Sequence, residues 1–517
     1  MKQSNRRPAH AVMSVVIIGL LATPAGSSHG ADYRKHPVWQ AQNAENHFGL
    51  RFLPPSRDWE RMHVYVPNGA TGKALPCVVF FYGGGWGGKN PWTNDNNQKL
   101  LDSGYVVALP DYVLEAQQPV PLAIWDGAAA IRYLRANAEE FRIDPARICA
   151  VGLSAGGWLV QYLSVSDSGT QIGMRAPDKS GWYAPMVERH PADAEFSARV
   201  CAFVTDWGAG TLCEASRMAE PQAWLGPDDP PLFTCVSMPK TWLTPGVRAY
   251  REAGALAEAA HIYSYDRDGK KSFRENVIDF GHCVVGVKVD SIRTDDPQTG
   301  AEITFGERTL QFLDKYVKGS EIAGAPEIIP GGGPLFGRTN VVLRTFHKNA
   351  QILYTVNGSL PTPGGVTTRR YDQPVPVQPG TTLRAITVVP GLPMSGTATA
   401  MYTEAPCVAP VITTVQQEYK TKVGQPFSVT LKATCTEPVT WRMCGKIEAQ
   451  ALEKIDSNKD SSAVKQQALW LSLNPETGVL SGTPPGPGVS VLIAVAHVSA
   501  APAVNDARRL VVVVEKP

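Results

Sequence analysis

Between residues 61 and 317, short apolar runs alternate with segments of helical periodicity. The runs PCVVFFY (76–82) and YVVAL (105–109) are almost wholly apolar, which is typical of strands buried on both faces of a parallel sheet. Residues 122–141 repeat apolar residues at three- and four-residue spacing, which predicts a helix, and a closing helix is expected at 308–317. Further strands are expected at residues 61–66, 148–151, 200–205, 232–236 and 262–265. This alternation predicts a doubly wound, mostly parallel α/β sheet within residues 32–322.

The pattern changes after residue 319. Residues 323–334 are rich in proline and glycine, which predicts a linker. The rest of the chain shows short strands separated by turn signals, such as the hairpin dipeptide Asn357-Gly358. We therefore expect two all-β, immunoglobulin-like sandwich modules, at residues 335–404 and 411–517.

The first 31 residues have the pattern of a secretory signal peptide. Lys2, Arg6 and Arg7 precede an apolar run at residues 11–22, and small residues follow. The run is short for a bilayer span, and no other segment approaches that length. The sequence therefore predicts cleavage of residues 1–31 and a protein that is secreted, periplasmic or on the cell surface, without a transmembrane segment.

Charge and cysteine usage narrow the function classes. The net charge is +2, and Lys and Arg form no stripe interleaved with aromatic residues, so no nucleic-acid partner is expected. The nine cysteines and ten histidines form no CxxC or HxxxH spacing, so no metal and no cofactor are expected. Cys435 and Cys444 flank Trp441 and are the best candidates for an intradomain disulfide, with Cys407 as a competitor.

The candidate chemistry is centred on residues 147–161, which read RICAVGLSAGGWLVQ. An apolar strand runs into Gly152-Leu153-Ser154-Ala155-Gly156, and a helix-compatible run follows at once. This is the nucleophile-elbow pattern G-x-S-x-G, in which a tight strand-to-helix turn exposes the serine hydroxyl. The chain has 47 glycines, so the motif alone is weak. Its position between a strand and a helix favours Ser154 as a nucleophile.

Two other stretches supply the groups that a serine nucleophile needs. A triple glycine, residues 83–85, directly follows the apolar run 76–82, and backbone N–H groups there can approach a substrate oxygen. With the N–H of Ala155, Gly84 and Gly85 are candidate oxyanion donors. His282 follows the last predicted strand in the sequence DFGHC, which makes it the candidate general base.

These motifs together resemble the secreted esterase/lipase branch of the α/β-hydrolases, which includes hormone-sensitive-lipase-like esterases and bacterial carbohydrate or feruloyl esterases. The resemblance is carried by YGGGW (82–86), PDYVL (110–114), residues 124–159, WLGPDDPPLF (224–233) and FGH (280–282), and it covers about residues 45–320. It implies Ser154 as nucleophile, His282 as base, and Gly84, Gly85 and Ala155 as oxyanion donors.

The chain departs from this family at two positions. Tyr82 stands where the family usually has a histidine before the glycines. Lys240 stands in the loop where the family places the triad acid. A substitute acid is Asp206, at the end of the preceding predicted strand, although a structural turn role fits it as well. Three other aspartates are nearer His282 in sequence but less well placed by topology: Asp266, Asp268 and Asp279.

The C-terminal modules carry resemblances of their own. Residues 352–362 and 383–403 are similar to the chitobiase/hexosaminidase C-terminal module, and residues 471–484 resemble immunoglobulin-like modules of bacterial surface proteins. Both imply spacer or polymer-adhesion roles. The function expected from the whole chain is cleavage of carboxylic esters, including acyl groups on polysaccharides. The alternatives are a catalytically impaired scaffold that binds or adheres, and a serine peptidase of the same fold.

Overall fold

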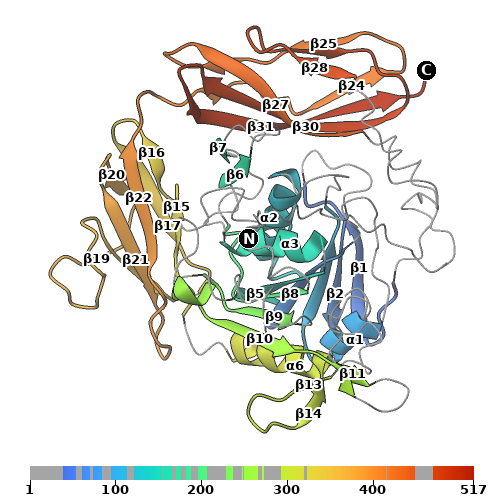
Figure 1. Ribbon diagram of the computed structural model, residues 1–517, viewed down its shortest axis with the longest axis vertical. Helices are drawn as coiled ribbons and strands as arrows, with labels where there is room; N and C mark the ends of the chain where they lie inside the picture. Colours follow the sequence, from blue (N-terminus) through green and yellow to red (C-terminus); the bar gives the residue numbers. More distant parts are fainter. Residues whose placement is uncertain are drawn as a thin grey trace, which may run out of the picture.

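The computed structural model describes most of the chain beyond residue 38. The described ranges are 39–53, 61–69, 74–83, 95–112, 121–153, 155–165, 171–175, 182–187, 196–206, 229–236, 247, 250–265, 271–272, 293–319, 323–347, 349–414, 416–448 and 470–517. The predicted signal peptide, residues 1–31, lies outside them. Two β-rich units lie against a central α/β unit (Figure 1).

An eight-stranded sheet forms the centre of the α/β unit, with strand order β1-β2-β4-β3-β5-β8-β9-β10. Only β2 runs antiparallel to its neighbours. The strands are β1 (Ala44–Leu50), β2 (Met62–Pro67), β3 (Leu75–Phe81), β4 (Val106–Pro110), β5 (Ile143–Leu153), β8 (Phe203–Asp206), β9 (Leu232–Val236) and β10 (Ala257–His261). The expected doubly wound α/β sheet is confirmed. The predicted last strand at 262–265 is wrong, because β10 (Ala257–His261) takes that place beside β9.

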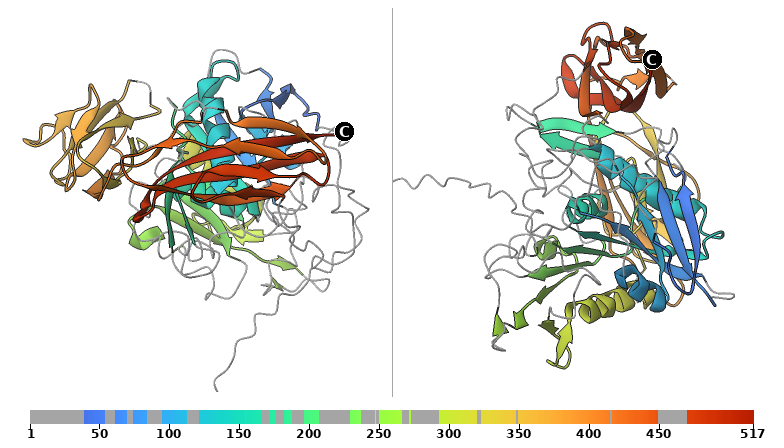
Figure 2. Two further views of the ribbon diagram at one scale, coloured as in Figure 1. Left: turned by 90° about the horizontal axis from the view of Figure 1, so that it is seen from above. Right: turned by 90° about the vertical axis from the view of Figure 1, so that its right-hand side faces the viewer.

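Helices cover both faces of this sheet (Figures 1 and 2). Helices α2 (Pro121–Ala136) and α3 (Ala155–Val165) share one core with the sheet, and α1 (Asp95–Asp102) and α6 (Phe305–Leu313) share the other. In β3, Val79 points into the first core and Val78 into the second. Burial on both faces explains why these strands are continuous apolar runs rather than alternating ones.

Helix α6 is anchored on the sheet by an aromatic stack. The ring of Phe233 in β9 lies 5.6 Å from that of Phe305 and 5.3 Å from that of Phe312, centroid to centroid. At the start of the helix, Thr304 and Glu307 form a capping box. The helix continues into one π-helical segment, η5 (Asp314–Lys318), so the predicted helix at 308–317 is confirmed with an earlier start.

The first β module is a two-sheet sandwich. One sheet has the order β15-β17-β20 and the other β16-β22-β21-β18-β19, and side chains of both form one core. The strands are β15 (Glu327–Ile329), β16 (Gly333–Leu335), β17 (Thr339–Arg344), β18 (Gln351–Thr355), β19 (Arg369–Arg370), β20 (Val375–Val377), β21 (Thr382–Val388) and β22 (Ala398–Glu404). Strands β15 and β16 lie in the proline- and glycine-rich stretch that was predicted to be a linker, so that stretch is part of the sandwich.

The second β module is also a sandwich, with sheets β24-β31-β30-β27 and β25-β29-β28 around one core. The strands are β24 (Glu418–Lys422), β25 (Phe427–Thr430), β27 (Val439–Glu448), β28 (Leu471–Leu473), β29 (Val479–Gly482), β30 (Gly488–Val498) and β31 (Ala501–Glu515). Cys435 is a free thiol and packs in a small cluster with Cys407. The predicted disulfide between Cys435 and Cys444 is therefore wrong. The immunoglobulin-like label for both modules stays a prediction.

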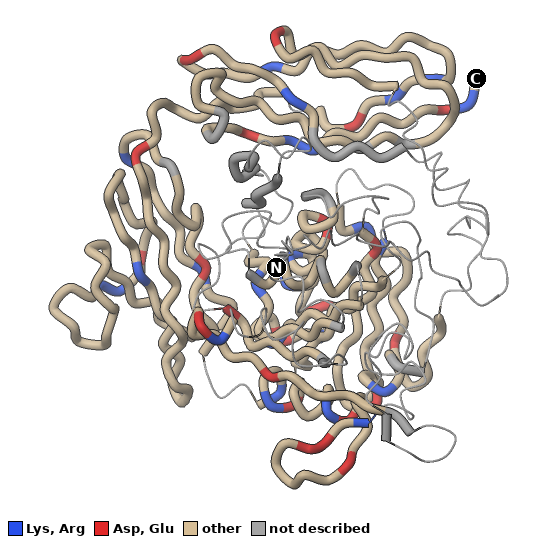
Figure 3. Tube along the Cα trace, viewed as in Figure 1, with Lys and Arg blue, Asp and Glu red and all other residues tan. Residues whose placement is uncertain are grey.

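Short two-stranded sheets complete the described secondary structure. Their strands are β6 (Gln171–Arg175) with β7 (Trp182–Val187), β11 (Ser264–Tyr265) with β12 (Lys271–Ser272), β13 (Arg293–Asp295) with β14 (Glu302–Thr304), and β23 (Val411–Ile412) with β26 (Ala433–Thr434). Among the described residues, no helix combines the length and apolar character needed to cross a membrane. Basic and acidic residues are interspersed along the described trace (Figure 3).

Truncating Phe233 to alanine tests the aromatic stack. We expect Phe233→Ala to lower the free energy of unfolding by about 3–5 kcal/mol, because it leaves a cavity between α6 and the sheet. Urea unfolding followed by circular dichroism measures this. The matched control is Phe336→Ala, whose ring is 54% exposed, and a similar loss in both variants would contradict the packing argument.

Candidate active site

The parallel strands bring their carboxyl ends to one edge of the central sheet. Strands β3, β5, β8, β9 and β10 end there at Phe81, Leu153, Asp206, Val236 and His261. In sheets of this kind, ligands bind outside the carboxyl ends of the strands. The predicted oxyanion loop, elbow and substitute acid each follow or end one of these strands.

Several of the predicted site residues lie outside the described part of the chain. These are Ser154, Gly84, Gly85 and His282, together with Lys240, Asp266, Asp268 and Asp279. The structure describes the backbone of Ala155, which opens α3, and of Asp206, which ends β8. The backbone on either side of Ser154 is therefore described, at Leu153 and at Ala155.

The flanks of Ser154 form a tight strand-to-helix turn. Strand β5 ends at Leu153 and α3 begins at Ala155, so one residue separates them. A Cβ atom on Gly152 would lie 2.3 Å from the carbonyl oxygen of Gly156. A Cβ atom on Gly156 would lie 2.2 Å from the carbonyl oxygen of Phe81 and 2.5 Å from that of Tyr82. Both glycines of the G-x-S-x-G motif are thus required by backbone contacts that exclude any side chain.

The contact at Gly156 also brings the elbow against the base of the glycine loop. Tyr82, which precedes the three glycines, is buried, and its ring stacks on that of Tyr112 at 4.7 Å. The Tyr112 hydroxyl donates a hydrogen bond of 2.6 Å to the carbonyl oxygen of Tyr82. Burial raises the pKa of Tyr112, and the Asp111 carboxylate adds to this, so the hydroxyl stays protonated as a donor.

The sequence did not single out Tyr112. It stands in the PDYVL stretch at residues 110–114, directly after β4, and this position was the only signal for it in the sequence. Its hydroxyl is bonded to Tyr82, the residue directly before the candidate oxyanion loop. The stacked pair also shows how Tyr82 fits where a histidine was expected.

Strand β8 lies directly beside the elbow strand. Asp206 is the register partner of Leu153, the residue before Ser154. The neighbouring Thr205 is buried, and its hydroxyl accepts a hydrogen bond of 3.2 Å from the Gln161 side chain of α3. Thr205 and Gln161 therefore tie α3 to β8 within three turns of the nucleophile position. The backbone of Asp206 is therefore adjacent to the end of the elbow strand.

Comparisons with known proteins match the same region. Residues 62–186 match the BD-FAE family, and residues 330–399 match the chitobiase/beta-hexosaminidase C-terminal domain. The chain is also similar to carboxylesterase NlhH of Mycobacterium tuberculosis, with 39% identity over 16% of this chain and 27% of that protein. The esterase resemblance is confirmed. The matched region from β2 to β7 is thus similar to the BD-FAE family, and most of the first β module is similar to the chitobiase C-terminal domain.

Other relatives of the esterase-type domain are also matched over part of their length. The arylesterase of Saccharolobus solfataricus is 34% identical over 20% of this chain and 34% of its own. Esterase LipQ of Mycobacterium tuberculosis is 26% identical over 29% of this chain and 42% of its own. The chain thus spans between about a quarter and two fifths of the length of these curated relatives.

Solved structures of esterases are similar to less than half of this chain. A truncated carbohydrate esterase from gut microbiota is 19% identical, with a TM-score of 0.37 over 44% of this chain and 90% of that one. Thermogutta terrifontis esterase 2 is 20% identical, with a TM-score of 0.32 over 43% of this chain and 83% of that one.

Removing the Tyr112 hydroxyl tests its role at the glycine loop. We expect Tyr112→Phe to lower kcat for a short ester about fivefold with little change in KM, because the lost hydrogen bond is worth about 1 kcal/mol and the ring stack remains. The matched control is Tyr65→Phe, which removes a hydroxyl bond of 3.1 Å to the Trp39 carbonyl elsewhere in the sheet. Steady-state kinetics on both variants measures this, and equal kcat losses would contradict a specific role for Tyr112.

Proposed function

We propose that this chain is a secreted serine hydrolase that cleaves carboxylic esters through an acyl-enzyme on Ser154. The observation that carries the proposal is the close approach of Gly156 to the carbonyl groups of Phe81 and Tyr82. This approach joins the candidate nucleophile turn to the start of the candidate oxyanion loop. The esterase-type match of residues 62–186 covers both segments and supports the same activity.

In the proposed mechanism, the Ser154 hydroxyl oxygen attacks the ester carbonyl carbon while His282 accepts the hydroxyl proton. The negative charge that forms on the carbonyl oxygen is stabilised by N–H donors at Gly84, Gly85 and Ala155, and one such donor is typically worth about 3–4 kcal/mol. The intermediate collapses, and the alcohol leaves with the proton from His282. Water then attacks the acyl-enzyme with His282 as base, which releases the carboxylic acid and restores Ser154.

We propose acyl groups linked to polysaccharides as the substrate class. The support is the match of residues 330–399 to a domain named after chitobiase and β-hexosaminidase, beside an esterase-type domain in one chain. Export is part of the proposal because residues 1–31 have a signal-peptide pattern. N-terminal sequencing of the exported protein, expected to begin near residue 32, tests it.

The central experiment measures ester turnover and acylation of Ser154. Purified full-length protein is expected to hydrolyse p-nitrophenyl acetate and to be labelled by a fluorophosphonate probe, with mass spectrometry placing the adduct on Ser154. Ser154→Ala should lose both, because no other hydroxyl occupies the elbow. Labelling without turnover would favour the impaired scaffold suggested by Lys240, and turnover of peptides but not esters would favour a serine peptidase. Absence of both labelling and turnover refutes the proposal.

The role of Asp206 as triad acid is tested separately. If Asp206 orients His282, then Asp206→Asn should lower kcat by about 10⁴, the scale of losing a triad acid. Aspartates 266, 268 and 279 provide matched controls, each changed to asparagine. The pre-steady-state acylation rate is measured for each variant. A large loss of this rate in one of the controls, and not in Asp206→Asn, would assign the triad acid to that control residue.

A further inference from the structure

Helix α2 is buried on every side along most of its length. All residues from 123 to 132 are buried, although only one side of the helix faces the central sheet. A helix on the face of an α/β sheet ordinarily exposes its outer side to solvent. Another part of the chain must therefore cover α2, and the second β module lies over it in two views (Figures 1 and 2).

The covering surface is the outer face of the β24-β31-β30-β27 sheet. Along β30, Leu492 and Ala494 point into the sandwich core, while Ile493 and Val495 belong to the core that contains α2 and α3. Strand β31 alternates in the same way, and its Val511 lies on the outer face. A sandwich sheet that is apolar on both faces is covered on both faces. The module is thus an additional layer of the α/β unit.

A buried ion pair crosses this interface. Arg509 of β31 donates a hydrogen bond of 2.5 Å from Nη1 to Oδ1 of Asp126 in the second turn of α2, and both side chains are buried. The residues are 383 positions apart in the sequence. Removing one partner of such a pair is strongly destabilising, since the buried charge of the other loses part of its compensation in a low-dielectric setting.

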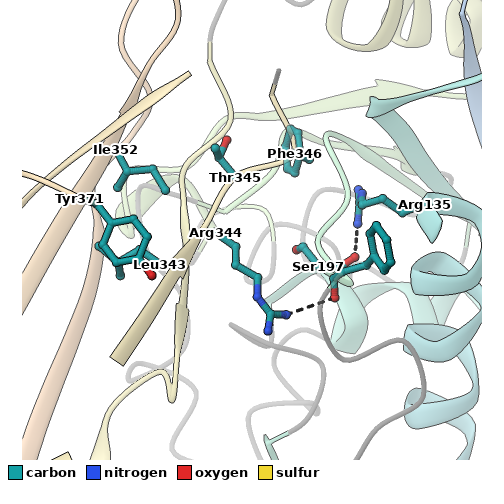
Figure 4. A pocket seen from close by; sticks show the side chains of 9 residues that line it. Arg135, Ser197, Leu343, Arg344, Thr345, Phe346, Ile352 and Tyr371 are labelled. Carbon is teal, nitrogen blue, oxygen red and sulfur yellow. Dashed lines mark hydrogen bonds between the residues drawn. The ribbon is translucent and has the colours of Figure 1, made fainter. Parts of the chain in front are cut away.

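The first β module contacts the opposite end of the same helix. The guanidinium of Arg135 in α2 lies 5.3 Å from the ring centre of Phe346, which follows β17 in the first β module. The same guanidinium donates a hydrogen bond of 2.8 Å to the carbonyl oxygen of Arg199, which lies before β8 in the α/β unit. Arg344 of β17 reaches across to the carbonyl oxygen of Phe196 (Figure 4). A cavity of about 290 Å³ lies at this junction. Both β modules therefore hold α2, one at each end.

Helix α2 in turn packs on the helix that carries the elbow. A Cβ atom on Gly127 would lie 3.0 Å from Cδ2 of Leu159 in α3 and 3.4 Å from the ring of Phe81. Gly127 is the neighbour of Asp126, and α3 begins one residue after Ser154. The contacts run without a gap from Arg509 through Asp126 and α2 to α3.

We propose that Arg509 is a positioning residue for the candidate active site: it holds α2 through Asp126, and α2 holds the helix that fixes the nucleophile elbow. The inference rests on the proposed esterase function. It makes the C-terminal module part of the active unit and not a spacer. Arg509 touches no reacting atom and acts through the two helices.

The test compares Arg509→Met and Asp126→Asn with the double variant and a control. Each single variant should lower kcat for p-nitrophenyl acetate at 25 °C about 10- to 100-fold with KM nearly unchanged, because small displacements of a nucleophile have effects of this size. The double variant should recover at least about tenfold over the worse single variant, since neither member of the buried pair then keeps its charge. The control is Arg508→Met, because Arg508 bonds to the Thr414 carbonyl within its own module.

Hydrogen exchange of α3 tests the positioning role of Arg509 without depending on ester turnover. Exchange of the amides of α3 should rise in Arg509→Met, and Arg509→Lys should restore part of the protection. If the wild-type chain turns over no ester but α3 exchange still rises, the function fails and the link holds. Unchanged α3 exchange, or a lower Tm with unchanged kcat, overturns the link. If Arg509→Met does not fold, Arg509→Lys and the double variant carry the same comparison.

Discussion

The candidate active site depends on a backbone contact that leaves no room for a side chain. Gly156 sits with its Cα against the carbonyl groups of Phe81 and Tyr82, while Gly152 sits against the carbonyl of Gly156. Helix α3 can start this close to β3 only because both positions lack a Cβ atom. The same contact determines how near the nucleophile turn lies to the glycine loop. Tyr112 bonds to the same Tyr82 carbonyl, directly before the glycine loop.

The buried pair of Asp126 and Arg509 determines how the C-terminal module sits on this framework. A buried ion pair often stabilises a fold no more than an apolar pair of the same volume would. Its effect is on geometry, because displacing the two charges from each other is costly. A slip of β31 by one residue would move Arg509 into the sandwich core and Leu510 onto α2. The pair therefore selects one register and one docking position for the module.

The sequence predicted the central sheet well and its last strand poorly. The apolar runs at β3, β4 and β9 identified these strands, because burial on both faces leaves a continuous apolar pattern. Strand β10 reads AEAAH, which has no strand propensity, and its pairing with β9 decides its conformation. The end of β5 directly before Ser154 and the end of β8 at Asp206 agree with the predicted order of the strands. The glycine loop and Ser154 lie outside the described residues and stay predictions. The bond from Tyr112 to Tyr82 was not predicted, since pairing across 30 residues leaves no local pattern.

The sequence of the second module contains a strand pattern that reflects its packing against α2. Residues 491–496 of β30 and 510–514 of β31 are continuous apolar runs, unlike the alternating strands of a sandwich with one solvated face. Helix α2 carries a matching signal, because AIWDGAAAI is apolar around its whole circumference apart from Asp126. Without the module, this surface would face water as an apolar patch. The α/β unit and the C-terminal module thus present complementary surfaces to each other, and Asp126 lies where they meet.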